Sequence, residues 1–272
     1  MKRFLILLLA LPPFTATAAA SLEQAEAALV HQDYSSALPT FQTLAASGNH
    51  TAEFDLAQMY QYGWGVAKDA GKAVDLYEKA ANSGMGKAQH NLGVIFERGE
   101  GVSRDYGKAM QWYLKAADQG LAKSMQKLGY MYYKGEGVKV DLKQALAWWS
   151  KAADRGEAEA EHNLGLMYYT GKGVPRNLSK AASYWKMAAE QGFAESQNSL
   201  ANLYFNGEYF DKDLVQAYVW FRLASTFGKP EADRSARVVG QLLGPKRTDK
   251  AEKRAHQAFD QIKARLQANA GS

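Results

Sequence analysis

The chain has 272 residues, 47% of them hydrophobic, which is enough to bury a core by packing alone. It contains no cysteine, and this excludes disulfides, thiolate catalysis and thiol redox chemistry. The formal net charge is +5.

The first 20 residues have the layout of a secretory signal peptide. Lys2 and Arg3 precede an apolar run over 4–11, and small residues follow, with cleavage expected after Ala18 or Ala20. The run is far shorter than the roughly 20 residues that span a membrane, so a cleaved signal is favoured over an anchor. We therefore predict a bacterial protein that is periplasmic or secreted. It is not a lipoprotein, because no cysteine follows the cleavage site.

A 36-residue unit dominates the rest of the chain and recurs five times. Its closing glycines are Gly84, Gly120, Gly156, Gly192 and Gly228, and its central leucines are Leu56, Leu92, Leu128, Leu164 and Leu200. The units, here called repeats 1 to 5, are predicted at 50–85, 86–121, 122–157, 158–193 and 194–229.

Each unit is predicted to form two helices joined by a glycine turn. In repeat 2 the two apolar stripes are Ala88, Leu92, Ile95 and Phe96, then Ala109, Trp112, Tyr113, Ala116 and Ala117. Gly99 and Gly101 are placed to turn the chain, because glycine accepts positive φ. Asp105 is placed to cap the second helix, and Gly93 leaves space for that helix to approach the first. Such a hairpin buries both stripes only by stacking on its neighbours.

The pattern Ala-x-x-x-Leu-Gly-x-x-Tyr/Phe-x-x-Gly-x-Gly-Val-x-x-Asp-x-x-Lys-Ala resembles the Sel-one-like repeat family, a branch of the tetratricopeptide-like solenoids. The resemblance covers about 51–228 and implies an all-α, right-handed superhelix of antiparallel hairpins, expected here as one continuous domain. Repeat 4 has Asn177 in place of the capping aspartate. Repeat 5 has Gly207-Glu208-Tyr209-Phe210 in place of Gly-x-Gly-Val, which puts its turn geometry in doubt.

The regions that flank the repeats are predicted to be helical caps. Residues 21–49 form a shorter tetratricopeptide-like hairpin without the glycine turn, and 230–272 form two helices, at about 230–243 and 248–266. Residues 229–272 hold ten Lys and Arg and five Asp and Glu, whereas 22–228 carry a net −2. This basic end is either a solvated helix surface or a contact for an anionic partner.

No active site emerges from the sequence. Ser124 with Lys127 and Ser183 with Lys186 match Ser-x-x-Lys, the nucleophile spacing of penicillin-recognising enzymes, but the companion motifs are absent. The stretch 65–72 resembles a phosphate loop that is one residue too long. His90 and His162 stand without a metal-ligand cluster. We therefore predict no catalysis, no cofactor and no metal, and nucleic acid is not expected as a partner.

The first helix of each repeat has a face that differs from its core stripe. This face is the predicted binding surface, because the resemblance implies that it lines a concave groove. We call it the first-helix face. Its candidate residues are Phe54, Gln58, His90, Asn91, Glu97, Gln126, Tyr130, Tyr133, His162, Asn163, Tyr169, Asn198, Asn202 and Phe205. Aromatic rings and amides suit protein or peptide recognition, and Tyr133 and Tyr169 are the strongest candidates. The alternative is that some of these side chains pack between repeats.

The sequence thus predicts a non-enzymatic envelope protein that binds a protein or peptide partner as a scaffold or adaptor. The resemblance also offers an immunity protein that neutralises an interbacterial toxin, such as a type VI phospholipase effector. A cell-wall hydrolase or penicillin-binding enzyme is the third and remote class. The partner and the oligomeric state stay open.

Overall fold

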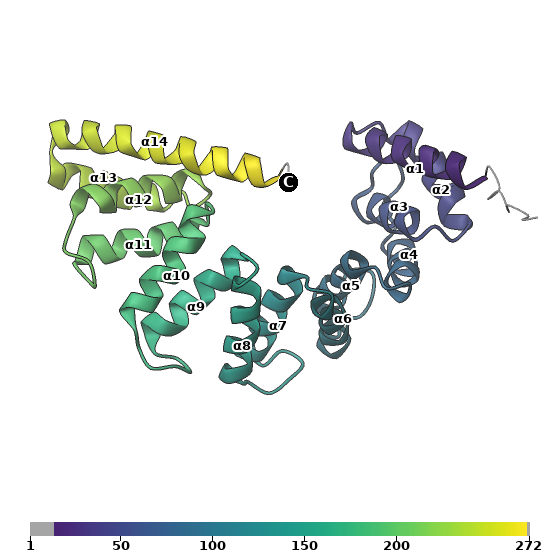
Figure 1. The fold of residues 1–272 in the computed structure, drawn as a ribbon, viewed down its shortest axis with the longest axis horizontal. Coiled ribbons are helices and arrows are strands. Elements are labelled where there is room, and N and C mark those ends of the chain that lie inside the picture. Colours follow the sequence, from purple (N-terminus) through teal and green to yellow (C-terminus); the bar gives the residue numbers. More distant parts are fainter. Residues whose placement is uncertain (1–13, 271–272) are drawn as a thin grey trace, which may run out of the picture. The chain divides into compact units, whose positions relative to one another are not determined.

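The computed structural model describes residues 14–270, and this part of the chain is all-α, with helices α1 to α14 and no strand (Figure 1). Each repeat supplies one hairpin. The hairpins are α3 (His50–Tyr62) with α4 (Ala70–Asn82), α5 (Gly86–Arg98) with α6 (Tyr106–Asp118), α7 (Ala122–Lys134) with α8 (Leu142–Ala153), α9 (Ala158–Thr170) with α10 (Leu178–Glu190), and α11 (Ala194–Asn206) with α12 (Leu214–Thr226). Before them lie α1 (Phe14–Val30) and α2 (Tyr34–Ala46), and after them α13 (Ala232–Leu243) and α14 (Pro245–Ala270).

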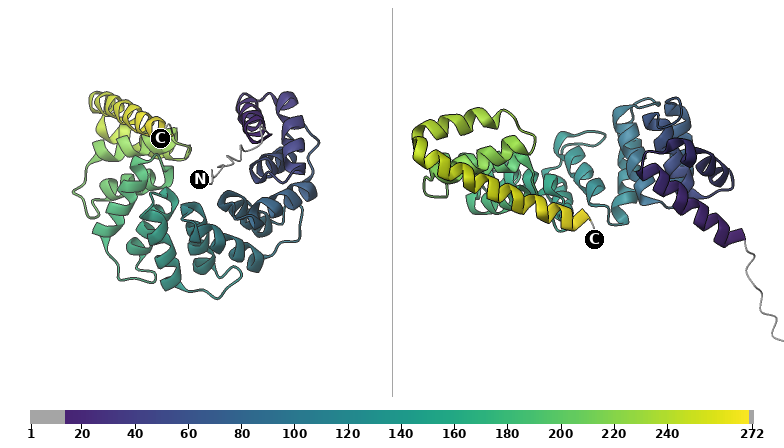
Figure 2. Two further views of the ribbon diagram at one scale, coloured as in Figure 1. Left: turned by 45° about the vertical axis from the view of Figure 1, so that its right-hand side comes forward. Right: turned by 90° about the horizontal axis from the view of Figure 1, so that it is seen from above.

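By its internal contacts the chain divides into two compact units. Unit 1 comprises residues 1–119 and holds α1 to α6, and unit 2 comprises 120–272 and holds α7 to α14. In each unit successive hairpins stack on one another along the chain (Figure 2). The division falls at the end of repeat 2.

Each hairpin of repeats 2 to 4 is closed by an aromatic ring that lies on a glycine. A Cβ atom added at Gly93, Gly129 or Gly165 would stand 2.4 Å from the nearest carbon of Tyr113, Trp149 or Trp185, respectively. The prediction that Gly93 admits a close approach is therefore confirmed. Repeats 1 and 5 instead have Ala57 and Ala201, with Tyr77 and Phe221 at the ring position.

The helix caps and turns follow the sequence closely. The side chain of Asp105 accepts a hydrogen bond from the backbone N–H of Lys108 at 2.9 Å, and Asn177 does the same for Lys180 at 2.9 Å. The asparagine of repeat 4 therefore preserves the cap. Repeat 5 also keeps its turn, since Tyr209 has φ +68°, close to the +78° of Gly101 in repeat 2. The doubt about this turn was unfounded, and the tyrosine takes a backbone conformation that usually selects glycine.

The N-terminal end begins with α1, which starts at Phe14 and runs through both predicted cleavage sites. The first 13 residues of the predicted signal peptide lie outside the described residues. Helix α2 packs on α3 through a core that includes Phe41, Leu56 and Met59. No helix in the described range combines the length and apolarity needed to cross a membrane.

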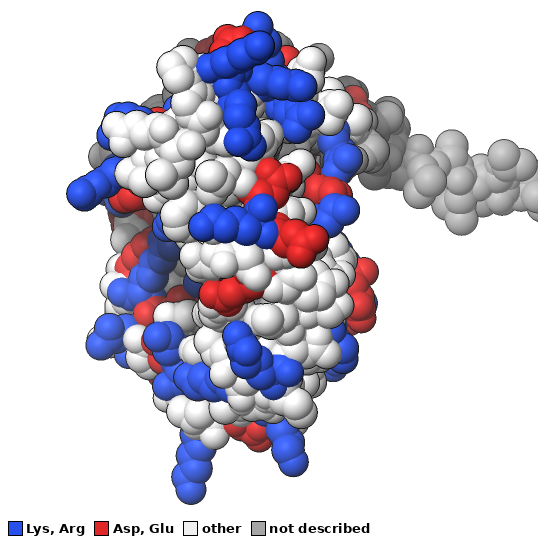
Figure 3. All heavy atoms as spheres, turned by 90° about the vertical axis from the view of Figure 1, so that its left-hand side faces the viewer, with Lys and Arg blue, Asp and Glu red and all other residues white. Residues whose placement is uncertain are grey.

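The C-terminal end is built by α13 and α14, and α14 lies against α12. The interface contains Val219, Leu223 and Ile262, so these helices cover the last apolar surface of repeat 5. Arg222 joins them by ion pairs of 2.7 Å to Asp233 and 2.9 Å to Glu252. In Figure 3, which faces the left-hand side of Figure 1, Lys and Arg side chains gather most densely at the upper end.

Candidate functional site

Many predicted residues of the first-helix face contact the ring that closes their own hairpin. The ring pairs, with centroid separations, are Phe54–Tyr77 (5.7 Å), His90–Tyr113 (5.5 Å), Tyr133–Trp149 (5.3 Å) and Tyr169–Trp185 (5.2 Å). All four first-helix members are half-buried, so each ring packs in its hairpin and keeps part of its surface exposed. Such rings are anchored before any partner arrives.

His162 is held inside this packing. Its ring lies 5.3 Å from the ring of Phe193, and its Nδ1 is 2.9 Å from the Ser196 hydroxyl oxygen. Burial lowers the pKa of His162 to about 4, so the imidazole is neutral at physiological pH. This histidine is a packing residue. No group of three His, Asp or Glu side chains suited to a metal occurs among the described residues.

The other predicted residues have more varied surroundings. Gln126 is buried with 4% exposure, so its side chain does not belong to an open surface. Glu97 accepts a hydrogen bond from the Tyr113 hydroxyl, and Lys134 lies over the ring of Tyr130. Gln58, Asn163 and Asn198 are half-buried. The remaining three, Asn91, Asn202 and Phe205, line pockets.

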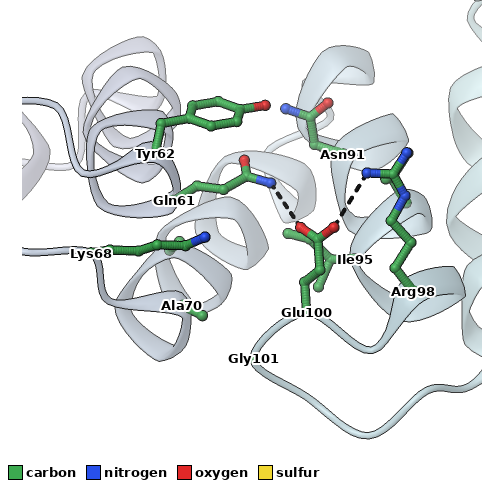
Figure 4. Close-up of a pocket in the computed structure, with 11 residues that line it drawn as sticks. Gln61, Tyr62, Lys68, Ala70, Asn91, Ile95, Arg98, Glu100 and Gly101 are labelled. Carbon is green, nitrogen blue, oxygen red and sulfur yellow. Dashed lines mark hydrogen bonds and ion pairs between the residues drawn. The ribbon is translucent and has the colours of Figure 1, made fainter.

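A pocket of about 550 Å³ lies between repeats 1 and 2 in unit 1 (Figure 4). We call it the first pocket. It is lined by Gln61, Tyr62, Lys68, Ala70, Ala73, Asn91, Val94, Ile95, Arg98, Glu100 and Gly101. Helices α3 and α5 supply most of its wall, and the turn after α5 closes it.

Two of the pockets in unit 2 are built from the same repeat positions as the first pocket. The second pocket, about 160 Å³ between repeats 4 and 5, is lined by Leu166, Tyr169, Trp185, Ser199, Asn202, Leu203, Asn206 and Glu208. The third, about 230 Å³ between repeat 5 and α13, is lined by Asn202, Phe205, Phe221, Arg234, Ser235, Val238 and Val239. Tyr169, Asn202 and Glu208 stand three repeats after Gln61, Val94 and Glu100, and Val238 stands one repeat after Asn202. The cavity is therefore a repeating feature, and α13 takes the place of a sixth first helix.

The residue after the first turn glycine contacts the preceding repeat. The Nε2 of Gln61 donates to Glu100 Oε2 at 3.4 Å, and the hydroxyl of Tyr169 donates to Glu208 Oε2 at 3.0 Å. Lys172 places its ammonium 3.9 Å from the ring centroid of Tyr133. Sequence reasoning missed these contacts. Their only signal is a constant spacing of 39 residues.

Two buried carboxylates, those of Glu161 and Asp55, occupy positions at which other repeats have amide side chains. Gln89 and Gln197 each donate Nε2 to a backbone carbonyl at the end of the preceding hairpin, at 3.0 Å, and Glu161 occupies their position in repeat 4. Glu161 is 1% exposed, and burial raises its pKa to about 7. Burial, with the nearby charge of Glu26, likewise raises the pKa of Asp55 to about 7. Both belong to the packing between helices rather than to an open cleft.

The comparisons with known proteins bear on this architecture. Residues 50–85, 86–121, 122–157, 158–193 and 194–226 each match the Sel1 repeat. The chain belongs to the Sel1 repeat family. Sel1 repeats typically form non-catalytic scaffolds for protein interaction. Among proteins of curated function, none matches this chain significantly.

Solved structures share the fold. A Sel1 repeat protein from Oxalobacter formigenes has a TM-score of 0.77 and 30% identity, covering 87% of this chain and 99% of its own. A protective antigen of uropathogenic Escherichia coli with an SLR fold has a TM-score of 0.57 and 28% identity, covering 93% and 63%. The immunity protein Pa5087 from Pseudomonas aeruginosa has a TM-score of 0.51 and 25% identity, covering 82% and 84%.

The catalytic motifs gain no support from their surroundings in this Sel1 repeat protein. Ser124 is fully buried in α7, so a substrate cannot reach its hydroxyl. Ser183 is exposed on α10, and the Nζ of Lys186 lies 4.0 Å from Oε1 of Glu190. The stretch 65–72 is a helix-to-helix turn followed by the start of α4.

Proposed function

We propose that this Sel1 repeat protein is a non-catalytic binding protein of the bacterial periplasm that holds a partner protein or peptide against its first-helix face. The observation that carries the proposal is the recurrence of one pocket at equivalent positions between repeats 1 and 2, between repeats 4 and 5, and between repeat 5 and α13. The adjacent second and third pockets of unit 2 suit a partner that presents several side chains in sequence, rather than a single small molecule.

Exposed apolar side chains in unit 2 support protein binding. Leu166, Val238 and Leu242 are 38%, 46% and 60% exposed, and the first two line the second and third pockets. Asn202 belongs to both pockets, so the two form one strip across α9, α11 and α13. Apolar residues grouped around hollows are typical of contact surfaces.

Site-specific photo-crosslinking tests the proposal. A photoreactive residue at Asn202, which is exposed within the strip, should give a discrete adduct with one protein when expressed in the native bacterium. The matched control is Met187, which is 44% exposed on α10 and lines none of the three pockets. Equal adducts from both positions, or none from either, would contradict a specific binding face.

The periplasmic location rests on the signal-peptide layout of 1–20. Mature protein isolated from the periplasmic fraction should begin at Ala19 or Ser21. A chain that keeps Met1 and fractionates with the cytoplasm would refute this part of the proposal.

A toxin-immunity role is the second candidate, and the likeness to the immunity protein Pa5087 favours it. The partner would then be a secreted interbacterial toxin, such as a type VI phospholipase effector. Co-expression with a candidate toxin should restore growth, and Val238→Asp should remove that protection while the protein stays folded. A scaffold in an envelope complex would give the crosslink at Asn202 but no protection.

A further inference from the structure

The first pocket differs from its counterparts in unit 2 by its charge. Lys68 and Arg98 bring two cations to its lining, and Glu100 brings the single acid. Figure 4 shows Lys68 and Arg98 approaching from opposite sides, with Gln61 and Glu100 between them. The lining therefore carries a net positive charge.

The carboxylate of Glu100 is already engaged. Its Oε1 lies 3.3 Å from Arg98 Nη1, and its Oε2 accepts from Gln61 at 3.4 Å. Gln61 is itself fixed, because its Oε1 accepts a 2.7 Å hydrogen bond from the Tyr77 hydroxyl. Glu100 thus neutralises one cation of the pocket and leaves the other.

Lys68 is the cation that remains. It is exposed at the pocket wall and makes no ion pair or hydrogen bond within the part of the chain that the structure describes. Its counterpart three repeats later, Arg176, is instead tied to Tyr169: the Nε donates to the Tyr169 carbonyl at 3.0 Å, and the guanidinium lies over the ring. Arg176 accordingly does not line the second pocket.

The remaining wall suits an anionic side chain on an apolar stem. The hydroxyl of Tyr62 and the amide of Asn91 face each other across the pocket and can donate hydrogen bonds (Figure 4). Ala73, Val94 and Ile95 line the pocket with apolar surface. The volume of about 550 Å³ also leaves room for the backbone that flanks such a side chain.

We propose that the first pocket binds a carboxylate of an acidic peptide, with Lys68 as its main charge partner and Arg98, Asn91 and Tyr62 as further donors. The inference rests on the proposed function, because it names the chemistry that one part of the binding face selects. The carboxylate comes either from a Glu or Asp side chain or from a peptide C-terminus.

Fluorescence anisotropy of three labelled peptides with the full chain tests this. One peptide has three internal glutamates and an amidated C-terminus, the second has glutamines in their place, and the third is the glutamine peptide with a free C-terminal carboxylate. The glutamate peptide or the free-carboxylate peptide should bind at least about tenfold more tightly than the amidated glutamine peptide, and less so at high salt. The better of the two identifies the source of the carboxylate.

Variants then locate the binding. Lys68→Ala should weaken binding of the preferred peptide about tenfold, and Lys68→Arg should retain it. Arg104 holds the same position one repeat later and does not line the first pocket, so Arg104→Ala is the matched control and should change nothing. Equal binding of all three peptides, or equal losses from Lys68→Ala and Arg104→Ala, would overturn the inference.

The peptide-binding test and the crosslinking test at Asn202 can fail independently of each other. An adduct at Asn202 without carboxylate binding would remove only the ligand assignment of the first pocket. Carboxylate binding without an adduct would leave the pocket as a ligand site and remove the partner-binding role of the strip in unit 2.

Discussion

The first and second pockets occupy equivalent positions in two units, yet they offer different chemistry. Arg98 in the first pocket corresponds to Asn206 in the second, and the exposed Lys68 corresponds to Arg176, which is tied to Tyr169. The turn carboxylates Glu100 and Glu208 are common to both. The repeat therefore fixes where a cavity forms, and a few variable side chains decide what it binds.

The glycine beneath each closing ring belongs to the shared frame, and changing it should have the largest effect. Gly165→Ala would bring a Cβ to 2.4 Å from Trp185, so the ring and the helix that carries it must shift. We expect a loss of about 2 to 3 kcal/mol in the free energy of unfolding, because overpacking outweighs the gain in helix propensity. Urea denaturation measures it.

A second substitution, Trp185→Phe, should restore the packing of the closing ring on residue 165. Gly165→Ala with Trp185→Phe reproduces the pairing of Ala201 and Phe221 in repeat 5 and should recover most of the lost stability. Gly71→Ala, in the exposed first turn of α4, is the control and should not destabilise. A stable Gly165→Ala protein would show that the hairpin is not closed by this contact.

Glu161, the buried carboxylate of repeat 4, should give an effect of intermediate size. In the folded chain the pKa of Glu161 is about 7, above its ordinary value, so the folded state binds the proton more tightly than the unfolded state. Protonated Glu161 contributes its full stabilisation at pH values below its pKa in the unfolded state. This stabilisation is lost as the pH rises through about 7. Glu161→Gln should therefore stabilise the protein by about 2 kcal/mol at pH 8 and by little at pH 4, because an amide carries no charge and donates as Gln89 does.

The comparison of melting temperatures at the two pH values checks this. Gln197→Glu, the reverse change at the same position one repeat later, should destabilise at pH 8. If Glu161→Gln has no effect at pH 8, the carboxylate is solvated and the interpretation is wrong.

The backward contact of the turn should have a smaller effect. Tyr169→Phe removes the hydroxyl that donates to Glu208 and should cost about 1 kcal/mol. Tyr133→Phe is the matched control, because the contacts of Tyr133 with Lys172 and Trp149 are made by its ring. This substitution should leave the stability unchanged. Equal losses in thermal melts would indicate that the hydroxyl of Tyr169 contributes nothing specific.

The turn of repeat 5 gives the smallest expected difference. Tyr209 has φ +68°, so glycine should be favoured over alanine there by up to about 1 kcal/mol. We expect Tyr209→Gly to be at least as stable as the parent and Tyr209→Ala to be less stable, because alanine keeps the strain and loses the ring contact with Phe210. The reverse order in chemical denaturation would contradict a strained turn.

The sequence predicted the hairpins, their caps and the close approach at Gly93, because these depend on local spacing and on one residue type. It did not predict the pockets, which depend on how one hairpin stacks on the next. The buried side chain of Gln126 shows the same limit, since a helical wheel places it on the first-helix face without saying how deeply the neighbouring helix covers it. The division after repeat 2 is likewise invisible in a pattern that repeats without interruption.

Asn202 forms a wall of both the second and the third pocket. A substitution there alters two neighbouring compartments at once, so specificity at adjacent sites along this strip is inherited jointly. A change of partner would then require coordinated substitutions in neighbouring repeats. Exchanging one repeat alone would leave each adjoining pocket with one original wall and one foreign wall.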